Sequence, residues 1–471
     1  MNNISRIFKN SALWLLFGDV VALTAAFTIS ELVAGIIKLP YYYQAGVLPT
    51  GVYFIHRQAL IFFYVGMFSL FWLGAKGHYR HRLPYWEKVS HILLIAGLGV
   101  VASIFGEMLA DNTISYAWFG GSWTLFIILL AGNRSIVQRW LDSRGEWKIP
   151  AILIGTGPSA AAVMHALSRE PSMGFYITVQ MNPKEIQNRT YPNAWKELLA
   201  EYDAGHVFLA LESAEFESQS HALKFLVRER LPCSIIPPWL GLPTGTLSQH
   251  HFLMHDVLLL HDTNRLYLPV PRLLKRGFDI FCSSLALLML LPLFAVVIHL
   301  VRKDGGAAFF LQDRVGKDGK TFKCYKFRSM RVDAEAFLKT YLQENPAAAE
   351  EWQKFQKLKN DVRITKIGKF IRKASIDELP QFINVLKGDM SLVGPRPITP
   401  EQKDFYGDDF VYYESVRPGI TGPWQVSGRN KLTFPERVRL ECSYARNWSL
   451  WMDIVIMIKT LPALLEKESA F

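Results

Sequence analysis

Four long apolar stretches in the first third of the chain constrain its fold more than any other feature. They cover residues 12–36, 52–73, 91–110 and 116–130. Each approaches the roughly 20 residues that an α-helix needs to cross the hydrocarbon core of a bilayer. The first is too long for a removable signal peptide and lacks a small-residue cleavage pattern. We therefore predict a transmembrane domain of four helices over residues 1–140.

Basic residues in the short loops predict the orientation of these helices. The loops at residues 39–51 and 111–115 contain no Lys or Arg. Basic residues cluster on the opposite side, at Arg6, Lys9, Lys76, Arg80, Arg82, Lys88, Arg134, Arg139, Arg144 and Lys148. Because cytoplasmic loops are enriched in Lys and Arg, we expect both ends of the domain, and everything after residue 134, to face the cytoplasm.

Asp19 lies near the middle of the first apolar stretch, where a charge is costly and often functional. No second acid or basic partner at a matching depth indicates a proton or ion path. We favour a protonated side chain or one paired with a neighbouring helix. A transporter is correspondingly disfavoured.

Composition narrows the partners without choosing one. The formal net charge is +11, from 52 Lys and Arg against 41 Asp and Glu. This balance suits a phosphate-rich partner, and nucleic acid, anionic lipid and nucleotide sugar all qualify. The four cysteines form no CxxC pair, so neither a disulfide framework nor a zinc site is predicted.

Residues 146–265 show alternating strand and helix signals. Apolar runs at 151–155, 175–179, 207–211 and 233–237 are separated by helical stretches, the first at 158–168. This order is typical of an open parallel α/β sheet of Rossmann type. The turn at 155–160 matches GxGxxA, but the acid expected about 20 residues later is absent. A nucleotide site and a purely structural domain both stay open.

Four histidines near the end of this region do not indicate a metal site. Because they lack helical metal-ligand spacing, we expect loop or core positions for His250, His251, His255 and His261.

The segment 272–303 carries a different kind of apolar helix. Basic residues flank its apolar run on both sides, and Pro292 lies near its middle. Equal basic flanks do not suit a membrane crossing, and an internal proline kinks a helix. We predict a re-entrant helix that enters the membrane, bends at Pro292 and leaves by the same face. The alternative is an ordinary fifth span, which would place the basic remainder outside the cell.

Adjacent carboxylates at Asp377 and Glu378 are the strongest catalytic candidates. One carboxylate can attack phosphorus to form an acyl phosphate, and its neighbour can hold a Mg²⁺ that neutralises a pyrophosphate. Alone, such a pair is more often an acidic helix N-terminus, here with Ser375 as its cap. The surrounding basic motifs make catalysis the better interpretation.

Several cations accompany the two acids. Lys326 and Arg328 alternate along a short predicted strand and so share one face. Arg396 is held between two prolines, and Arg429 ends a glycine-rich loop at 417–429. Arginine suits bidentate phosphate binding. With Arg314, these residues form the predicted phosphate-binding set.

The strings KFRSM, SIDELPQ, NVLKGDMSLVGPRP, PGITGPWQVSGR and WSLWMD carry a resemblance. Residues 271–471 resemble the bacterial sugar transferase domain of monotopic phosphoglycosyl transferases, and the whole layout resembles the large members of that family. The resemblance implies that Asp377 is the nucleophile and Glu378 the Mg²⁺ ligand. It also implies that Lys326, Arg396 and Arg429 bind the donor, that Asp453 is a further active-site acid and that Pro292 breaks the re-entrant helix.

The implied activity takes place on the cytoplasmic face of a bacterial inner membrane. A hexose 1-phosphate passes from a UDP-sugar to the aspartate, UMP leaves, and undecaprenyl phosphate then collects the phosphosugar. The family implies galactose first and glucose next as the sugar, and places the reaction as the first membrane step of O-antigen, capsule or exopolysaccharide assembly. It also implies a homodimer and no nucleic-acid partner. Asp361-Val-Arg363 lacks a proline often found there, and Asn430-Lys431 occupies a variable position.

Three alternatives remain. Asp377 could act as a general base for direct displacement. A membrane-anchored dehydratase or epimerase would need a Tyr-x-x-x-Lys pair, and no tyrosine here has a lysine four positions later. A non-enzymatic protein that grips anionic lipid through its basic C-terminal region is the third.

Overall fold

The computed structural model describes residues 2–44, 52–109, 116–229, 231–237, 247–251, 258–262, 266, 268–346, 349, 361–429 and 432–465. They divide into two compact units, Met1–Leu240 and Gly241–Phe471. The predicted helical domain and most of the predicted Rossmann-type domain fall within the first unit.

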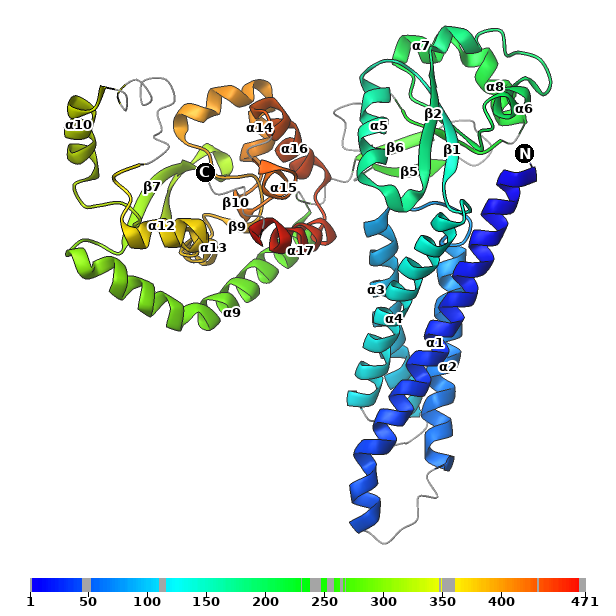
Figure 1. The fold of residues 1–471 in the computed structure, drawn as a ribbon, viewed down its shortest axis with the longest axis horizontal. Helices are drawn as coiled ribbons and strands as arrows, with labels where there is room; N and C mark the ends of the chain where they lie inside the picture. The colour runs from blue at the N-terminus through cyan, green and yellow to red at the C-terminus, as the bar shows by residue number, and fades with distance from the viewer. Residues whose placement is uncertain are drawn as a thin grey trace. The chain divides into compact units, whose positions relative to one another are not determined.

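The first unit begins with a bundle of helices α1 (Asn2–Gln44), α2 (Val52–Ala75), α3 (Tyr85–Leu109) and α4 (Tyr116–Ser143). Helix α1 packs against α2 and α4, and α3 against the same two helices (Figure 1). Phe62, Trp123 and Phe126 form edge-on ring contacts in its interior. Large apolar side chains such as Phe71 and Val101 face outward, which is consistent with a membrane protein.

The expected count of spans is only partly reproduced. Among the described residues, three helical segments are long and apolar enough to cross a membrane: Asn10–Val33, Tyr85–Gly106 and Pro269–Val301. The predicted second span corresponds to a shorter apolar helix, Leu60–Ala75. The predicted fourth lies in α4, which contains polar groups such as Arg134 and is not among the three.

Asp19 has the basic partner that the sequence did not reveal. It is fully buried and forms an ion pair with Arg134 of α4, whose Nη2 lies 2.5 Å from Oδ2. The hydroxyl of Tyr79 donates to the same oxygen at 2.7 Å. The structure therefore shows a carboxylate paired with a neighbouring helix, and corrects the expectation that no basic group lies at its depth.

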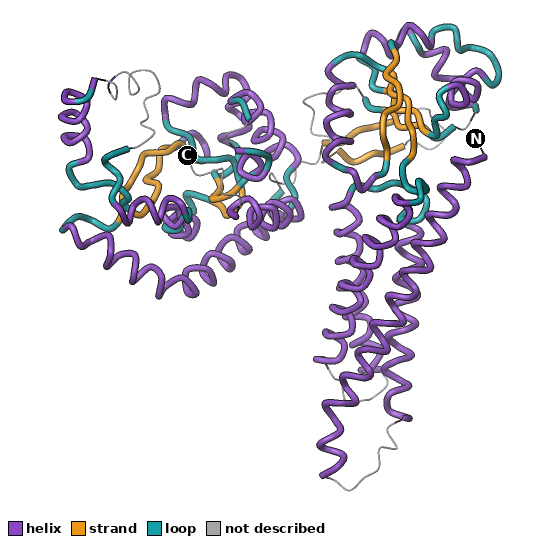
Figure 2. The backbone as a smooth tube through the Cα atoms, in the orientation of Figure 1, coloured by secondary structure: helices purple, strands orange, loops and turns teal. Residues whose placement is uncertain are grey.

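The second half of this unit is an open parallel sheet, whose strands are orange segments of the tube in Figure 2. Its strand order is β2-β1-β3-β4, and every pair is parallel. Buried apolar clusters lie on both faces of the sheet, as the Rossmann-type prediction requires. The elements are β1 (Ile149–Ile154), α5 (Pro158–Arg169), β2 (Phe175–Met181), α6 (Ala194–Glu201), β3 (His206–Leu209), α7 (Ser213–Ser218), α8 (Ser220–Arg228) and β4 (Cys233–Ile235).

The glycine turn before α5 favours the structural alternative over a nucleotide site. Gly155 has φ +136°, and a Cβ there would lie 2.1 Å from the carbonyl oxygen of Ala210. Glu212 accepts a hydrogen bond from the backbone N–H of Ser159 at 3.0 Å, and a Cβ on Gly157 would meet this carboxylate at 2.7 Å. The chain's own carboxylate therefore lies where an anion would bind at the N-terminus of α5.

The second unit starts with the antiparallel pair β5 (Leu247–His251) and β6 (Leu258–Asp262). Loop or core positions were expected for the four histidines. His250, His251 and His261 lie on these strands, which excludes a loop position for them, and His255 lies outside the described residues. The remaining elements are α9 (Pro269–Val301), β7 (Phe309–Val315), β8 (Thr321–Phe327), α10 (Ala334–Glu344), α12 (Lys366–Lys373), η6 (Ile376–Glu378), α13 (Gln381–Lys387), β9 (Ser391–Val393), η7 (Pro400–Asp409), α14 (Phe410–Glu414), β10 (Gly419–Thr421), α15 (Pro423–Val426), α16 (Phe434–Asn447) and α17 (Leu450–Leu465).

Helix α9 is one continuous, bowed helix along one side of this unit (Figure 1), with Pro292 inside it. Near its start, Asp279 accepts hydrogen bonds from Ser391 and from the backbone N–H of Leu392. Near its end, Phe294, Val297 and Val301 join an apolar cluster with Phe327 and Ile371. Both ends of α9 therefore pack against the same domain.

Candidate active site

A cavity of about 1460 Å³ lies within the second unit. It exceeds the roughly 300–1,000 Å³ typical of small-ligand pockets, so it can hold a large donor such as a nucleotide sugar. Residues from β8, η6, α15 and the loop after β9 line it, together with α9 and α17 at its apolar side. Six predicted site residues line it: Lys326, Arg328, Asp377, Glu378, Arg396 and Arg429.

The backbone around Asp377 and Glu378 explains why both acids face the cavity. Helix α12 ends at Lys373, and Ser375 then adopts φ 55°, a left-handed conformation that redirects the chain. Ile376 and Leu379 pack into the apolar cluster beneath α12. Because these two neighbours point inward, the intervening acids are presented to the cavity. Ser375 makes no side-chain capping bond, so the helix-cap interpretation is not supported.

Glu378 is the carboxylate that the cations share. Lys326 Nζ lies 2.8 Å and Arg396 Nη2 3.3 Å from its Oε1. Burial would raise the pKa of Glu378, but the charges of Arg396 and Lys326 prevail and lower it to about 2. Glu378 is therefore ionised at any physiological pH.

Asp377 has a different environment from its neighbour. Burial raises its pKa to about 6, with Lys326 opposing the rise and the charge of Glu378 adding to it. At pH 7 it is mostly ionised, and among the described residues no ion pair holds its carboxylate. Two adjacent acids with pKa values pushed apart are the arrangement expected of groups with separate roles.

Arg396 is held from behind by a buried cluster that sequence reasoning missed. Its backbone N–H donates to Glu441 Oε1 at 3.0 Å, and Arg437 pairs with the same carboxylate at 3.1 Å. The hydroxyl of Tyr406 donates to Glu441 as well. On the cavity side the guanidinium lies 5.5 Å from the ring centre of Trp424. No sequence motif signalled this support, because Glu441 lies 45 positions from Arg396.

Three predicted site residues are placed differently from the expectation. Arg328 borders the cavity, but its guanidinium donates to the carbonyls of Ala307, Met330 and Val301. Through Val301 it ties β8 to the end of α9. It directly follows the last residue of β8 and lines the same cavity as Lys326.

Arg314 and Asp453 do not line the cavity. Arg314 donates to the carbonyl of Pro397 at 3.2 Å, which places it behind Arg396. Asp453 is buried and forms an ion pair with Lys275 of α9 at 2.7 Å. The ion pair joins α9 to α17, and the role of an active-site acid stays a prediction for Asp453.

The cavity also contains polar residues that were not predicted, among them Arg331, Arg363, Arg372 and Gln425. Gln425 is the most informative. Its side chain is 6% exposed, and neither its amide oxygen nor its amide nitrogen has a hydrogen-bond partner in the described structure. A buried amide without partners is costly, so this group is suited to meet a polar ligand.

The donor set limits how a metal ion could bind. Among the described residues, no group of three or more His, Cys, Asp or Glu side chains could hold one. Mg²⁺ is commonly bound by one or two carboxylates together with substrate phosphates. Glu378 therefore fits a Mg²⁺ shared with donor phosphates, and not one in a cage of protein ligands.

Comparison with known proteins agrees with the resemblance inferred from the motifs. Residues 270–467 match the family described as Bacterial sugar transferase. The chain is 38% identical to the undecaprenyl-phosphate galactose phosphotransferase of Salmonella typhimurium, over 85% of this chain and 86% of that protein. It is 35% identical to the UDP-galactose-lipid carrier transferase of Erwinia amylovora, over 85% and 86%. It is also 35% identical to an uncharacterized sugar transferase of Haemophilus influenzae, over 98% and 99%.

Proposed function

The chain belongs to the bacterial sugar transferase family and is a sugar-phosphate transferase, and we propose that it moves a hexose 1-phosphate from a UDP-sugar onto undecaprenyl phosphate. Galactose is the proposed sugar, because two similar proteins carry it in their names. The observation that carries the proposal is that the two adjacent carboxylates have different environments. Glu378 is bound by two cations, while Asp377 is ionised at pH 7 and forms no ion pair among the described residues.

The proposed reaction has two steps. A carboxylate oxygen of Asp377 attacks the β-phosphorus of the donor, the bond from that phosphorus to the bridging oxygen breaks, and UMP leaves with the bond's electron pair. A phosphate oxygen of undecaprenyl phosphate then attacks the aspartyl-bound phosphorus, which releases the carboxylate and forms the lipid diphosphate sugar. Splitting the transfer in this way avoids bringing two anionic substrates together.

Each nearby charged residue has a proposed task in these steps. Arg396 and Lys326, held in place by Glu378, stabilise charge on the phosphate oxygens during each displacement. Trp424 limits the movement of Arg396 on one side of the cavity. A Mg²⁺ bound between Glu378 and the donor would neutralise the pyrophosphate. Direct displacement with Asp377 as general base remains the competing route.

The pH dependence of the first step should follow Asp377. Because its pKa is raised to about 6, the nucleophile is protonated and inactive at lower pH. UMP release under subsaturating donor should fall about tenfold per pH unit below 6 and level off above 7. The rate should be measured at constant ionic strength between pH 4.5 and 8. A flat profile across pH 6 would contradict the assignment, because Glu378 titrates near 2.

Gln425 is proposed to recognise the UDP-sugar, because its amide can form hydrogen bonds with sugar hydroxyls or with the edge of the uracil ring. Gln425→Leu keeps the side-chain volume and removes both polar atoms, so kcat/KM for the preferred donor should fall about 10–100-fold. Gln343→Leu, on the exposed surface of α10, is the matched control. An unchanged kcat/KM for every UDP-sugar in Gln425→Leu would exclude this role.

A re-entrant path is proposed for α9. The packing of both its ends against one domain supports this path, because a crossing helix would carry one end to the opposite face. Val270→Cys and Lys303→Cys, at exposed positions near the two ends, should both react with a membrane-impermeant maleimide from the same side of oriented vesicles. The test needs a chain whose four native cysteines are replaced. Labelling from opposite sides would show an ordinary span.

The proposed setting is the cytoplasmic face of the bacterial inner membrane, in polysaccharide assembly. We keep the predicted regions as proposals: four membrane helices in residues 1–140, a Rossmann-type domain at 146–265 and a catalytic domain at 271–471. Homodimer formation also remains a proposal.

The test of the activity is UMP release from a panel of UDP-sugars by the purified full chain. Absence of UMP from all of them, with undecaprenyl phosphate present, would reject the proposed function.

A further inference from the structure

A second cavity, of about 790 Å³, lies in the first unit between α1, α2 and the turn that follows α2. Its walls are apolar along the two helices, where Leu16 and Val20 of α1 face Met67, Leu70 and Phe71 of α2. These residues lie within or beside the apolar helical segments described above. The cavity is therefore suited to an apolar chain.

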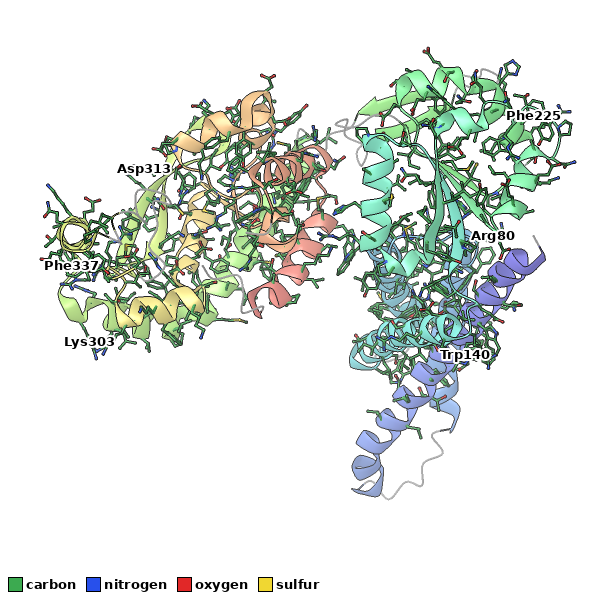
Figure 3. The ribbon with its side chains drawn as sticks, turned by 45° about the horizontal axis from the view of Figure 1, so that its top comes forward. Arg80, Trp140, Phe225, Lys303, Asp313 and Phe337 are labelled. Atoms are coloured by element: carbon green, nitrogen blue, oxygen red, sulfur yellow. The ribbon has the colours of Figure 1, made fainter. Side chains whose placement is uncertain are left out.

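The mouth of this cavity is basic, in contrast to its walls. Lys76, Arg80 and His81 line it, and all three side chains are exposed. They are carried by a tight turn at the end of α2, where Gly77 adopts φ +83° and the N–H of His78 donates to the carbonyl of Leu73 at 3.1 Å. This bonding pattern ends the helix and reverses the chain, which places the cations beside the apolar walls. Arg80 is labelled in Figure 3.

The cations at this mouth differ from the other basic residues of this unit. Within the described structure neither Lys76 nor Arg80 forms an ion pair, and Lys76 only approaches the ring of Trp72 at 5.4 Å. Other basic residues in this unit are engaged: Arg134 pairs with Asp19, and Arg82 lies 3.6 Å from the ring centre of Trp147. Two positive charges at the opening of an apolar cavity are complementary to an anionic head group with an apolar tail.

One wall of this cavity, between its basic mouth and its apolar part, is held in place by hydrogen bonds and an ion pair. Tyr79 lines the cavity, and its hydroxyl donates to Asp19 at 2.7 Å. Asp19 is in turn held by Arg134. Because this buried ion pair anchors Tyr79, this part of the cavity wall is held in position before a ligand binds.

We propose that this cavity binds one anionic glycerophospholipid of the surrounding bilayer. Its phosphate contacts Lys76 and Arg80, and an acyl chain lies along Val20, Leu70 and Phe71. Free phosphate is a poor occupant because it has no apolar part to lie against the apolar walls. A bulk bilayer lipid is the occupant chosen because the outward residues of α1 and α2, such as Phe17 and Phe71, are apolar and exposed. The site is separate from the proposed chemistry at Asp377.

Native mass spectrometry of the full chain in detergent tests the proposal, with phosphatidylglycerol and phosphatidylethanolamine of identical acyl chains as probes. We expect one phosphatidylglycerol to bind about tenfold or more tightly than phosphatidylethanolamine. The double variant Lys76→Gln/Arg80→Gln should lose this preference. The control Arg139→Gln/Arg144→Gln removes two exposed cations at the end of α4 and should keep it.

Further measurements distinguish an anionic phospholipid from other possible ligands of this cavity. Val20→Trp, which fills the apolar wall and leaves the cations, should weaken phosphatidylglycerol binding to the same degree as the charge variant. Glycerol 1-phosphate should not compete. The proposal is overturned if both lipids bind equally, if the two double variants behave alike, if glycerol 1-phosphate displaces the lipid, or if a polyprenyl phosphate binds where phosphatidylglycerol does not.

Discussion

Replacement of Asp377 by Asn is expected to lower the rate of sugar-phosphate transfer by about 10⁴-fold or more, because an amide cannot form the acyl phosphate. The side chain keeps its size, and the contacts of Glu378 with Lys326 and Arg396 are not altered by the change. UMP release with saturating UDP-galactose, with and without undecaprenyl phosphate, measures the effect. The control is Asp313→Asn, the same change at an exposed acid outside the cavity, which should retain normal activity.

The same substitution should stabilise the fold at neutral pH. The pKa of Asp377 is raised in the native state from 3.8 to about 6. The stability contributed by its protonated form is complete below about pH 4 and is lost as the pH rises through 6. At pH 7.5 the ionised carboxylate therefore lowers the free energy of unfolding by about 1–2 kcal/mol, and Asn removes this cost. An inactive protein that unfolds at a higher temperature separates lost chemistry from lost folding. An active Asp377→Asn variant would contradict the assignment.

Replacement of Glu378 by Gln is expected to lower the transfer rate about 10²–10³-fold. The neutral amide attracts Lys326 and Arg396 less strongly, so both cations lose the carboxylate that positions them. It is also a weaker ligand for a Mg²⁺ shared with the donor. The effect should appear in steady-state kinetics as a lower kcat/KM for the UDP-sugar. Glu401→Gln, at an exposed acid on η7, serves as the control.

The stability effect at Glu378 should have the opposite sign from that at Asp377. Its pKa is lowered from 4.5 to about 2, so the ionised form contributes stability above about pH 4.5 that is lost as the pH falls toward 2. Gln removes this contribution and should lower the free energy of unfolding at pH 7.5 by about 1–2 kcal/mol. The side chain is a quarter exposed, which keeps the figure modest. If both substitutions changed the free energy of unfolding equally and in the same direction, the two carboxylates would not have the different environments described here.

The sequence predicted strands and helices well where the pattern of apolar residues was typical of one kind of element. The four apolar runs between residues 151 and 237 became β1 to β4 in one parallel sheet, because short apolar runs separated by helices favour that arrangement. The two acids and the cations Lys326 and Arg396 were also predicted, and the structure brings them to one cavity. Their motifs lie on elements whose local turns direct them to the same side.

Contacts between distant residues were not predictable from local patterns. Arg134 lies 115 positions from Asp19, and only helix packing brings the two together. The WSLWMD string could not predict the buried ion pair between Asp453 and Lys275, because that contact depends on how α9 packs against α17. Gln425 lies within the PGITGPWQVSGR string, but nothing in that string singled it out, because an amide is informative only once its burial and missing partners are seen.

Intact-protein and peptide mass spectrometry of the full chain, incubated with UDP-galactose in the absence of undecaprenyl phosphate, tests the covalent step most directly. The account predicts a hexose phosphate adduct on the peptide that contains Asp377, formed with an equivalent of UMP, lost on addition of undecaprenyl phosphate and missing in Asp377→Asn. UMP released only when the lipid is present, with no adduct on that peptide, would contradict it and favour direct displacement.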